Sequence, residues 1–469
     1  MAFPDEAFDA AVSAFAQVQQ IPGVVAGVVQ DGRLVHVAAA GMADREAARP
    51  VVAGTAFRIA SMTKQVTALA ILALRDAGRI ALDAPLSEYV PQFAAVAAAT
   101  RDSPPVSLRH LLTHTAGFVT DDPWGDRVLG MTPAELDSLI ATGTLFARPP
   151  GLAFEYSNLG YALLGRALTN VSGEPYQSFI RRTILAPLGM TQTGFDAIAA
   201  QRGDYAFGYR LDGEQWSRER IEPDGEVGAM GGLATAAPDY ARWVAFLLDA
   251  WPARDDPERG PVRRASVREL ALWQSPPFPP ETADGQAVVP SAYGYGLIHS
   301  ADARLGTCLH HSGGLPGYGS HVLMLPHRGW GAFAFGNRTY ARMSRLTWRL
   351  AELLHEAAPR AAPVPPSAVL ARAIEGVVSA YAGGRIEAAR VPFAVNFLLD
   401  MPAHLRDAEL VSLKEQLGEG SLEKIEPLHA LGGRFTLTCA RGRLAGTITL
   451  SPDPEPGIQK LLLVAEPAA

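Results

Sequence analysis

The chain has 469 residues, 48% of them hydrophobic and 19% charged, which predicts a folded protein with more than one domain and a large core. Its 41 basic and 48 acidic residues give a formal net charge of −7, which excludes the basic surface typical of nucleic-acid-binding proteins. No run of about 18 apolar residues occurs, and the chain does not start with a basic segment followed by an apolar one, so we expect a cytoplasmic protein without a signal peptide or membrane span.

The chain opens with one helical and two strand patterns. Apolar side chains at helical spacing predict a helix over 4–19. Two β-rich runs follow over 23–41, on either side of Asp31-Gly32, a dipeptide that favours a tight hairpin turn. From about 60 to 290, helical patterns and Pro or Gly turns dominate.

Strand patterns return later in the chain, at 305–314, 321–326 and 331–337. A helix over 341–358 follows them. The simplest packing joins the two strand groups into one antiparallel sheet flanked by helices, with a helical insertion over about 60–290 beside it. We therefore expect a first domain of mixed α/β (α+β) class over residues 1–357.

Residues 358–367, "APRAAPVPPS", are rich in Ala and Pro and predict a stiff linker. A second unit of about 100 residues, 368–469, follows it. Its helical patterns come first, and three or four alternating strands come after them, which predicts a small α+β domain ending in an antiparallel sheet. A small barrel of the lipocalin type is the alternative, and the helices disfavour it.

Two stretches fit the pattern Ser-x-x-Lys. Ser61 and Lys64 lie where a well-patterned helix begins, so the three-residue spacing places the lysine one turn on and on the same face. Ser421 and Lys424 precede a predicted strand, where such positions point to opposite faces. A lysine whose pKa is lowered by burial or by nearby charge can take the proton from a serine nucleophile. The sequence thus favours Ser61, although an ordinary helix cap is the alternative reading of an isolated match.

Two further stretches supply groups that acyl transfer requires. "YSN" places Tyr156 and Asn158 in a loop before an apolar helix, and a tyrosine whose phenolate is favoured by a nearby lysine can act as a base. "HHSGG" places His311 at the end of a strand, before glycines whose backbone allows close approach of a substrate. The segments "SMTK", "YSN" and "HSG", in this order and with flanks such as "VSLRHLLTHTAGF" and "GAMGGLATAAPDYARWVAFLL", resemble the three motifs of the β-lactamase-like serine hydrolases over residues 5–357.

The resemblance implies a sandwich of the β-lactamase/transpeptidase type and a role for each matching residue. Ser61 would be the acylated nucleophile, and Lys64 and Tyr156 would activate it and move protons to the leaving group. Asn158 would orient Lys64 and the substrate. No cofactor would be needed. The family comprises class C β-lactamases, D-alanyl-D-alanine carboxypeptidases, D-aminopeptidases and related carboxylesterases.

The third motif would complete the site. His311 would occupy the position of a lysine or histidine on the edge strand, with Ser312 and Gly313 beside it, and the backbone N–H groups of Ser61 and Gly314 would form the oxyanion hole. Class C β-lactamases carry Lys-Thr-Gly there, whereas this chain has His-Ser-Gly. Histidine is mostly neutral at neutral pH, which weakens recognition of a substrate carboxylate.

We therefore expect a serine hydrolase acting through an acyl-enzyme, with small acyl esters as favoured substrates. A β-lactamase or D-amino-acid peptidase is the alternative, and a catalytically silent binding protein is a more distant one. The small C-terminal domain resembles the cystatin-like or nuclear-transport-factor-like α+β domains sometimes attached to such hydrolases.

Other candidate residues are open to two interpretations. His110 and His114 have the spacing of a zinc-binding helix, but no glutamate follows His110 and no third ligand is evident, so we predict no metal site. Three aromatic residues fall in the Gly- and Pro-punctuated stretch 116–151 and predict either core packing or a pocket wall, namely Phe118, Trp124 and Phe146. Tyr293 and Tyr295 are further candidates for the cleft wall.

Overall fold

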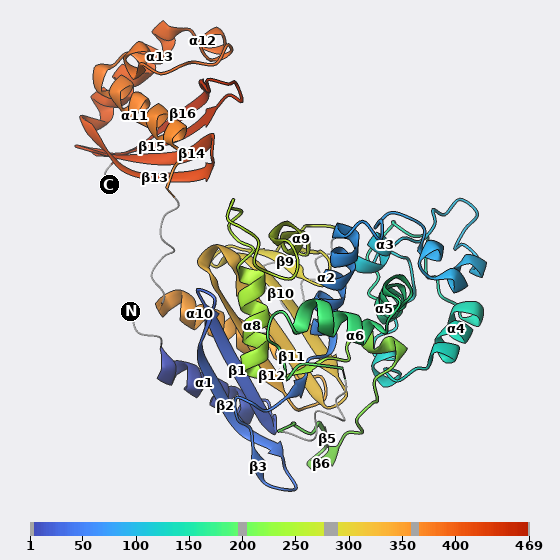
Figure 1. Ribbon diagram of the computed structural model, residues 1–469. Coiled ribbons are helices and arrows are strands. Elements are labelled where there is room, and N and C mark those ends of the chain that lie inside the picture. The colour runs from blue at the N-terminus through green and yellow to red at the C-terminus, as the bar shows by residue number, and fades with distance from the viewer. Residues whose placement is uncertain (1–3, 196–203, 276–288, 358–364, 468–469) are drawn as a thin grey trace. The chain divides into compact units, whose positions relative to one another are not determined.

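The computed structural model describes residues 4–195, 204–275, 289–357 and 365–467 (Figure 1). The chain divides into two compact units, Met1–Arg360 and Ala361–Ala469, and each has its own hydrophobic core. Most of the predicted Ala/Pro linker, 358–364, lies outside the described residues.

The first unit is built on an eight-stranded antiparallel sheet of order β3-β2-β1-β12-β11-β10-β9-β8. Its strands are β1 (Gly23–Gln30), β2 (Arg33–Asp44), β3 (Arg49–Pro50), β8 (Ser291–Tyr293), β9 (Ile298–Asp302), β10 (Gly306–Leu315), β11 (Tyr318–Leu325) and β12 (Trp330–Gly336). β1 pairs with β12 from Val24 opposite Gly336 to Gln30 opposite Trp330. The prediction that the two strand groups join in one antiparallel sheet is confirmed.

The hairpin between β1 and β2 turns at Asp31 and Gly32, whose φ angles are 49° and 75°. Two positive φ angles in succession match the right-handed twist of the flanking strands, and Asp-Gly is a dipeptide that tolerates them. The hairpin prediction is confirmed.

Alternation along the strands divides the first unit into two cores. Val24 and Val28 face one side with α1 (Asp5–Val18) and α10 (Ser344–Ala357), while Val25 and Val29 face the other. On that second side lie α2 (Thr63–Asp76) and α8 (Ala237–Leu248) (Figure 1). The helices on both faces keep the sheet's apolar side chains from water.

The stretch predicted as an insertion, about 60–290, is mainly helical, but α2 and α8 within it pack on the sheet. Its other helices are α3 (Leu108–Leu112), α4 (Pro133–Thr142), α5 (Asn158–Ser172), α6 (Tyr176–Ile180) and α9 (Arg264–Glu269). The prediction missed two short pairings inside it, β4 (Phe57–Arg58) with β7 (Ala234–Thr235) and the hairpin of β5 (Tyr209–Asp212) with β6 (Gln215–Arg218).

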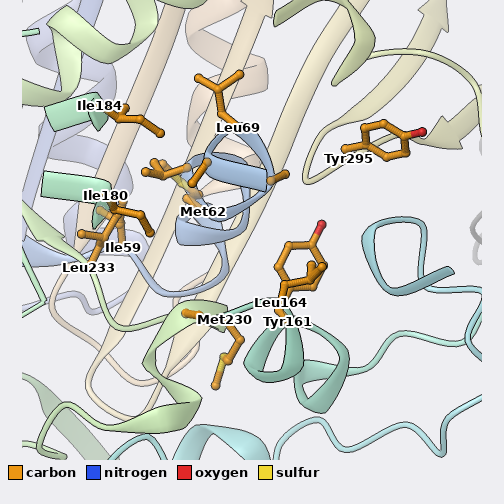
Figure 2. Close-up of a cluster of buried hydrophobic side chains, with 14 of the residues drawn as sticks. Ile59, Met62, Leu69, Tyr161, Leu164, Ile180, Ile184, Met230, Leu233 and Tyr295 are labelled. Carbon is orange, nitrogen blue, oxygen red and sulfur yellow. The ribbon is translucent and has the colours of Figure 1, made fainter. Parts of the chain in front are cut away.

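A buried cluster surrounds the first turn of α2 and holds it to the insertion. Figure 2 shows side chains from α2, α5, α6 and the segments around Ile59 and Leu233 meeting there. Ile59, Met62, Leu69, Leu164 and Met230 are each exposed by at most 1%. Burying large apolar side chains contributes about 1.5–3 kcal/mol each, so this turn is rigidly placed.

The second unit contains α11 (Ala368–Gly383), α12 (Phe397–Asp400) and α13 (Ala403–Leu417), followed by β13 (Gly420–His429), β14 (Gly432–Cys439), β15 (Gly442–Leu450) and β16 (Ile458–Pro467). The strands form an antiparallel sheet of order β13-β14-β15-β16, in which the first and last strands are not neighbours. The predicted α+β unit is confirmed, and the barrel alternative is wrong. Among the described residues of the whole chain, we find no helix long and apolar enough to span a bilayer.

Candidate active site

The segment "FRIASMTK" passes from β4 through a 3₁₀ turn, Ala60–Met62, into α2. Ala60 has a φ angle of 49°, in a region that costs a non-glycine residue about 1 kcal/mol or more. Ser320 on β11 donates to the Ile59 carbonyl at 2.7 Å. A Cβ on Gly313 would come within 2.3 Å of that carbonyl oxygen, so glycine is needed there to let β10 approach the turn.

Ser61 is not the cap of α2. The N-cap position is Met62, and no side chain caps the helix. Instead, the Ser61 Oγ lies 3.0 Å from Lys64 Nζ, as the Ser-x-x-Lys spacing predicts. The alternative match, Ser421, lies exposed on β13.

Lys64 is fully buried and makes three hydrogen bonds. Besides Ser61 Oγ, its Nζ contacts Asn158 Oδ1 at 2.8 Å and the Met230 carbonyl oxygen at 2.8 Å. Burial lowers the pKa of Lys64 to about 8, while Asp126, Asp122 and Asp121 oppose that shift. A neutral amine in this position can donate two of these bonds and accept the Ser61 proton through its lone pair.

Tyr156 and Asn158 lie at the start of α5. Ser157 caps the helix by accepting from Gly160 N at 3.2 Å. The Tyr156 phenol hydrogen-bonds Ser61, but burial raises its pKa well above 10. The expected phenolate is therefore wrong for the free protein, because the cost of burying the charge outweighs the hydrogen bond to Ser61. Asn158 Nδ2 is buried and makes no hydrogen bond to any residue that the structure describes.

Two residues fix this loop, and neither was assigned that role from the sequence. Asp121 accepts from Asn158 N and Leu159 N, each at 2.6 Å, and so satisfies two N–H groups at the start of α5. His114 accepts from Ser157 N at 3.2 Å, and its ring lies 4.3 Å from the ring of Tyr156. Thus His114 supports Tyr156, and in the described part of the chain no cluster of metal-ligating side chains includes it.

His311 is 4% exposed and hydrogen-bonded through both ring nitrogens. Its Nδ1 donates to the Ser312 carbonyl oxygen at 2.6 Å, and its Nε2 lies 3.0 Å from the Tyr293 hydroxyl. Burial and the nearby Lys64 lower the pKa of His311 to about 3. The third motif therefore carries no cation.

The expectation of an edge strand needs correction. β9 and β8 lie beyond β10 in the sheet, so β10 is an inner strand. However, the pairing of β9 with β10 ends at His310, opposite Ile298. From His311 onward β10 has no partner in β9, and Ser312 and Gly314 line the cleft there.

A cleft of about 400 Å³ brings the candidate residues together. It is lined by Ser61, Thr120, Asp122, Phe154, Tyr156, Tyr293, Ile298, His311, Ser312, Gly314 and Tyr340. Lys64 and Asn158 lie buried beneath it, and Gly313 packs against the turn. The candidates from all three motifs thus converge on one site.

The weaker aromatic candidates have mixed outcomes. Tyr293 lines the cleft, whereas Tyr295 is buried and accepts from Arg109 instead. Phe118 is 1% exposed and packs against Phe146, so both are structural. Trp124 is 48% exposed and does not line the cleft.

Comparisons with known proteins place this geometry in context. The model of the Beta-lactamase family matches residues 8–356. Esterase EstB from Burkholderia gladioli is 34% identical over 292 residues, which are 59% of this chain and 71% of that protein. Protein flp from Staphylococcus aureus is 28% identical over 322 residues, covering 68% of this chain and 60% of that protein, which is less than two thirds of its length.

Among solved structures, the octameric penicillin-binding protein homologue from Pyrococcus abyssi covers 99% of this chain and 99% of its own, with a TM-score of 0.64 and 20% identity. At this identity the likeness shows the fold alone. The predicted fold, an antiparallel sheet flanked by helices with a helical part and a small C-terminal unit, is confirmed.

Proposed function

The chain belongs to the β-lactamase family, and from that premise we propose that it is a serine hydrolase that forms an acyl-enzyme on Ser61. The observation that carries the proposal is the contact of 3.0 Å between Ser61 Oγ and the buried Lys64 Nζ. A lysine with a pKa near 8 holds a usable fraction of neutral amine at neutral pH, so it can act as a general base.

In the first half of the reaction, Ser61 Oγ attacks the carbonyl carbon of an ester while its proton passes to Lys64 Nζ. The oxygen that becomes negative is bound by the backbone N–H groups of Ser61 and Gly314, both of which line the cleft. The bond from carbon to the alcohol oxygen then breaks. The Lys64 ammonium returns the proton to the alcohol through the Tyr156 hydroxyl.

In the second half, water attacks the acyl-enzyme and gives its proton to the same pair, Lys64 and Tyr156. The bond between the acyl carbon and Ser61 Oγ breaks, Ser61 regains a proton, and the acid leaves. Asn158 fixes Lys64 through Oδ1. No cofactor enters either half.

We favour esters over β-lactams and D-peptides, whose carboxylates need a cation in the cleft. His311 is neutral, and no Lys or Arg is among the residues that line the cleft. The likeness to Esterase EstB supports the same choice. The family match keeps β-lactam or peptide hydrolysis as the alternative.

The test compares native protein, Ser61→Ala and Ser421→Ala on p-nitrophenyl butyrate, with nitrocefin in parallel. Ser421→Ala is a matched control, because it removes the serine of the other Ser-x-x-Lys match. We expect ester turnover to vanish in the first variant alone, with little nitrocefin cleavage. Nitrocefin cleavage exceeding ester cleavage would assign β-lactamase activity. Failure of a fluorophosphonate to label Ser61 would instead indicate a silent binding protein.

For the second unit, we propose a structural or substrate-shaping role rather than a part in the chemistry. The residues that line the cleft at Ser61 all belong to the first unit. A protein ending at Ala357 is expected to fold and to keep ester hydrolysis. If the shortened protein folded but hydrolysed no ester, the domain assignment of 1–357 as the complete hydrolase would be wrong.

A further inference from the structure

The cleft above Ser61 has the composition of a site for an organic cation. Four of its lining residues are aromatic, namely Phe154, Tyr156, Tyr293 and Tyr340. One is acidic, Asp122, and none is basic. Aromatic faces attract ammonium groups through their ring electrons, and a neighbouring carboxylate adds a direct charge attraction.

The carboxylate of Asp122 is available to a ligand. Its side chain is exposed, and none of the hydrogen bonds or ion pairs of the described residues includes it. Its charge reaches the reactive groups, because it acts electrostatically on Lys64, Tyr156 and Tyr340. A substrate at Ser61 therefore lies within its field.

The neighbouring carboxylates are already used by the protein. Asp121 holds the start of α5, and Asp126 is buried and accepts from the Tyr340 hydroxyl at 3.0 Å. Only Asp122 of these three lines the cleft.

No positive group of the described protein offsets Asp122 inside the cleft. Lys64 lies beneath the cleft and uses its Nζ on Ser61, Asn158 and Met230. His311 offers no charge at neutral pH, because its ring is buried and burial lowers its pKa to about 3. An incoming carboxylate is repelled, whereas an incoming ammonium finds a counter-ion and aromatic walls.

We propose that the cleft selects esters that carry an ammonium group, with Asp122 as the residue that determines this preference. The inference rests on the proposed esterase function and specifies its substrate class. The cation can belong to the acyl part or to the alcohol of the ester, and the experiment below distinguishes the two.

The experiment uses the full chain and two pairs of esters that match in shape and differ in charge. The acyl pair is the p-nitrophenyl esters of 4-(trimethylammonio)butyrate and 5,5-dimethylhexanoate. The alcohol pair is butyrylcholine and 3,3-dimethylbutyl butyrate. Each rate is divided by the hydroxide-catalysed rate of the same ester, so that intrinsic reactivity cancels. We expect kcat/KM to favour the cation about tenfold in at least one pair.

Asp122→Asn should reduce that ratio about fivefold or more, and added salt should reduce it in the native protein. The ratio is the readout, because any general loss of activity affects both esters of a pair. Glu214→Gln is the matched control: Glu214 lies exposed in the turn between β5 and β6, and its replacement changes the net charge equally.

The outcomes separate the two proposals. Equal hydrolysis of both esters in both pairs, or a ratio unchanged by Asp122→Asn, would overturn the cation preference and leave the esterase intact. Hydrolysis of no ester, together with no fluorophosphonate labelling of Ser61, would overturn the proposed function itself.

Discussion

Replacing Asp126 by Asn should shift the pH dependence of hydrolysis to lower pH. Of the three carboxylates that raise the pKa of Lys64, Asp126 has the largest effect. The Tyr340 hydroxyl lies 3.0 Å from the Asp126 carboxylate in the native protein. The amide oxygen of an asparagine can accept the same hydrogen bond, so we expect the packing to be retained. Burial raises the pKa of Asp126 to about 7, so its carboxylate is mostly charged near pH 8, where Lys64 titrates. Without that negative charge, the ammonium form of Lys64 is less stable, and its pKa falls.

The expected size of the effect follows from the pKa of about 8. At pH 7, about one amine in ten is then neutral. An opposite charge in close contact with a group shifts its pKa by about one unit or more, and a more distant charge shifts it by about half a unit. We therefore expect the inflection of kcat/KM to move from about pH 8 to about pH 7–7.5.

The assay is kcat/KM for p-nitrophenyl butyrate between pH 5.5 and pH 10, chosen as a range of about two units or more on each side of the inflection. The ester has no titrating group, and the rate of Ser61→Ala is subtracted at each pH. The inflection is compared rather than a single rate, because an amine of lower pKa is also a weaker base. An inflection that stays in place, or moves to higher pH, would refute Lys64 as the titrating base.

Three further predictions follow from the same contacts. Tyr156→Phe keeps the ring against His114 but removes the hydroxyl, so kcat should fall by about two to four orders of magnitude in stopped assays. A near-native kcat in this variant would remove Tyr156 from the mechanism. Asp121→Ala should lower the free energy of unfolding by about 1–2 kcal/mol in urea titrations and should also reduce kcat. Asp121→Asn should restore part of both quantities. Equal kcat in the native protein and both variants would exclude a positioning role for Asp121. Burial lowers the pKa of His310 to about 4 and that of His311 to about 3, so the unfolded chain binds more protons than the folded chain below pH 6.5. The free energy of unfolding should therefore fall as the pH drops from 6.5 to 4, by up to about 1.4 kcal/mol per pH unit for each histidine. Urea midpoints that do not change with pH in this range would contradict the prediction.

Much of the fold is predictable from the sequence because its signals are local. The hairpin at Asp31-Gly32 is encoded in its turn residues, and the strands of the second unit in their alternation. The short strands β4 and β7 carry no such signal. Each has two residues, and they pair across more than 170 positions of sequence, so they are set by tertiary packing.

The candidate site is predictable where residue spacing places side chains on one face of a helix. The prediction fails where burial determines the ionisation of a side chain. The distance between Ser61 and Lys64 follows from one helical turn. The ionisation of Tyr156 was wrongly predicted, because a lysine charge can be read from sequence but the loss of water around a phenol cannot. Asp121, Asp122 and Asp126 lie in a loop whose composition is that of an ordinary solvent-exposed turn. Only the structure shows that Asp121 holds the start of α5, that Asp122 lines the cleft and that Asp126 is buried.

These carboxylates link the base to the substrate preference. Burial alone lowers the pKa of Lys64, and the carboxylates oppose it, which leaves the amine near the pH at which it must accept a proton. Asp122 takes part in that balance and also lines the cleft, whereas Asp126 takes part in the balance from a buried position. Asp122→Asn should therefore change both the inflection and the preference for ammonium esters, and Asp126→Asn mainly the inflection. If both variants changed both properties equally, the cation preference would arise from the general field of the site and not from contact with Asp122.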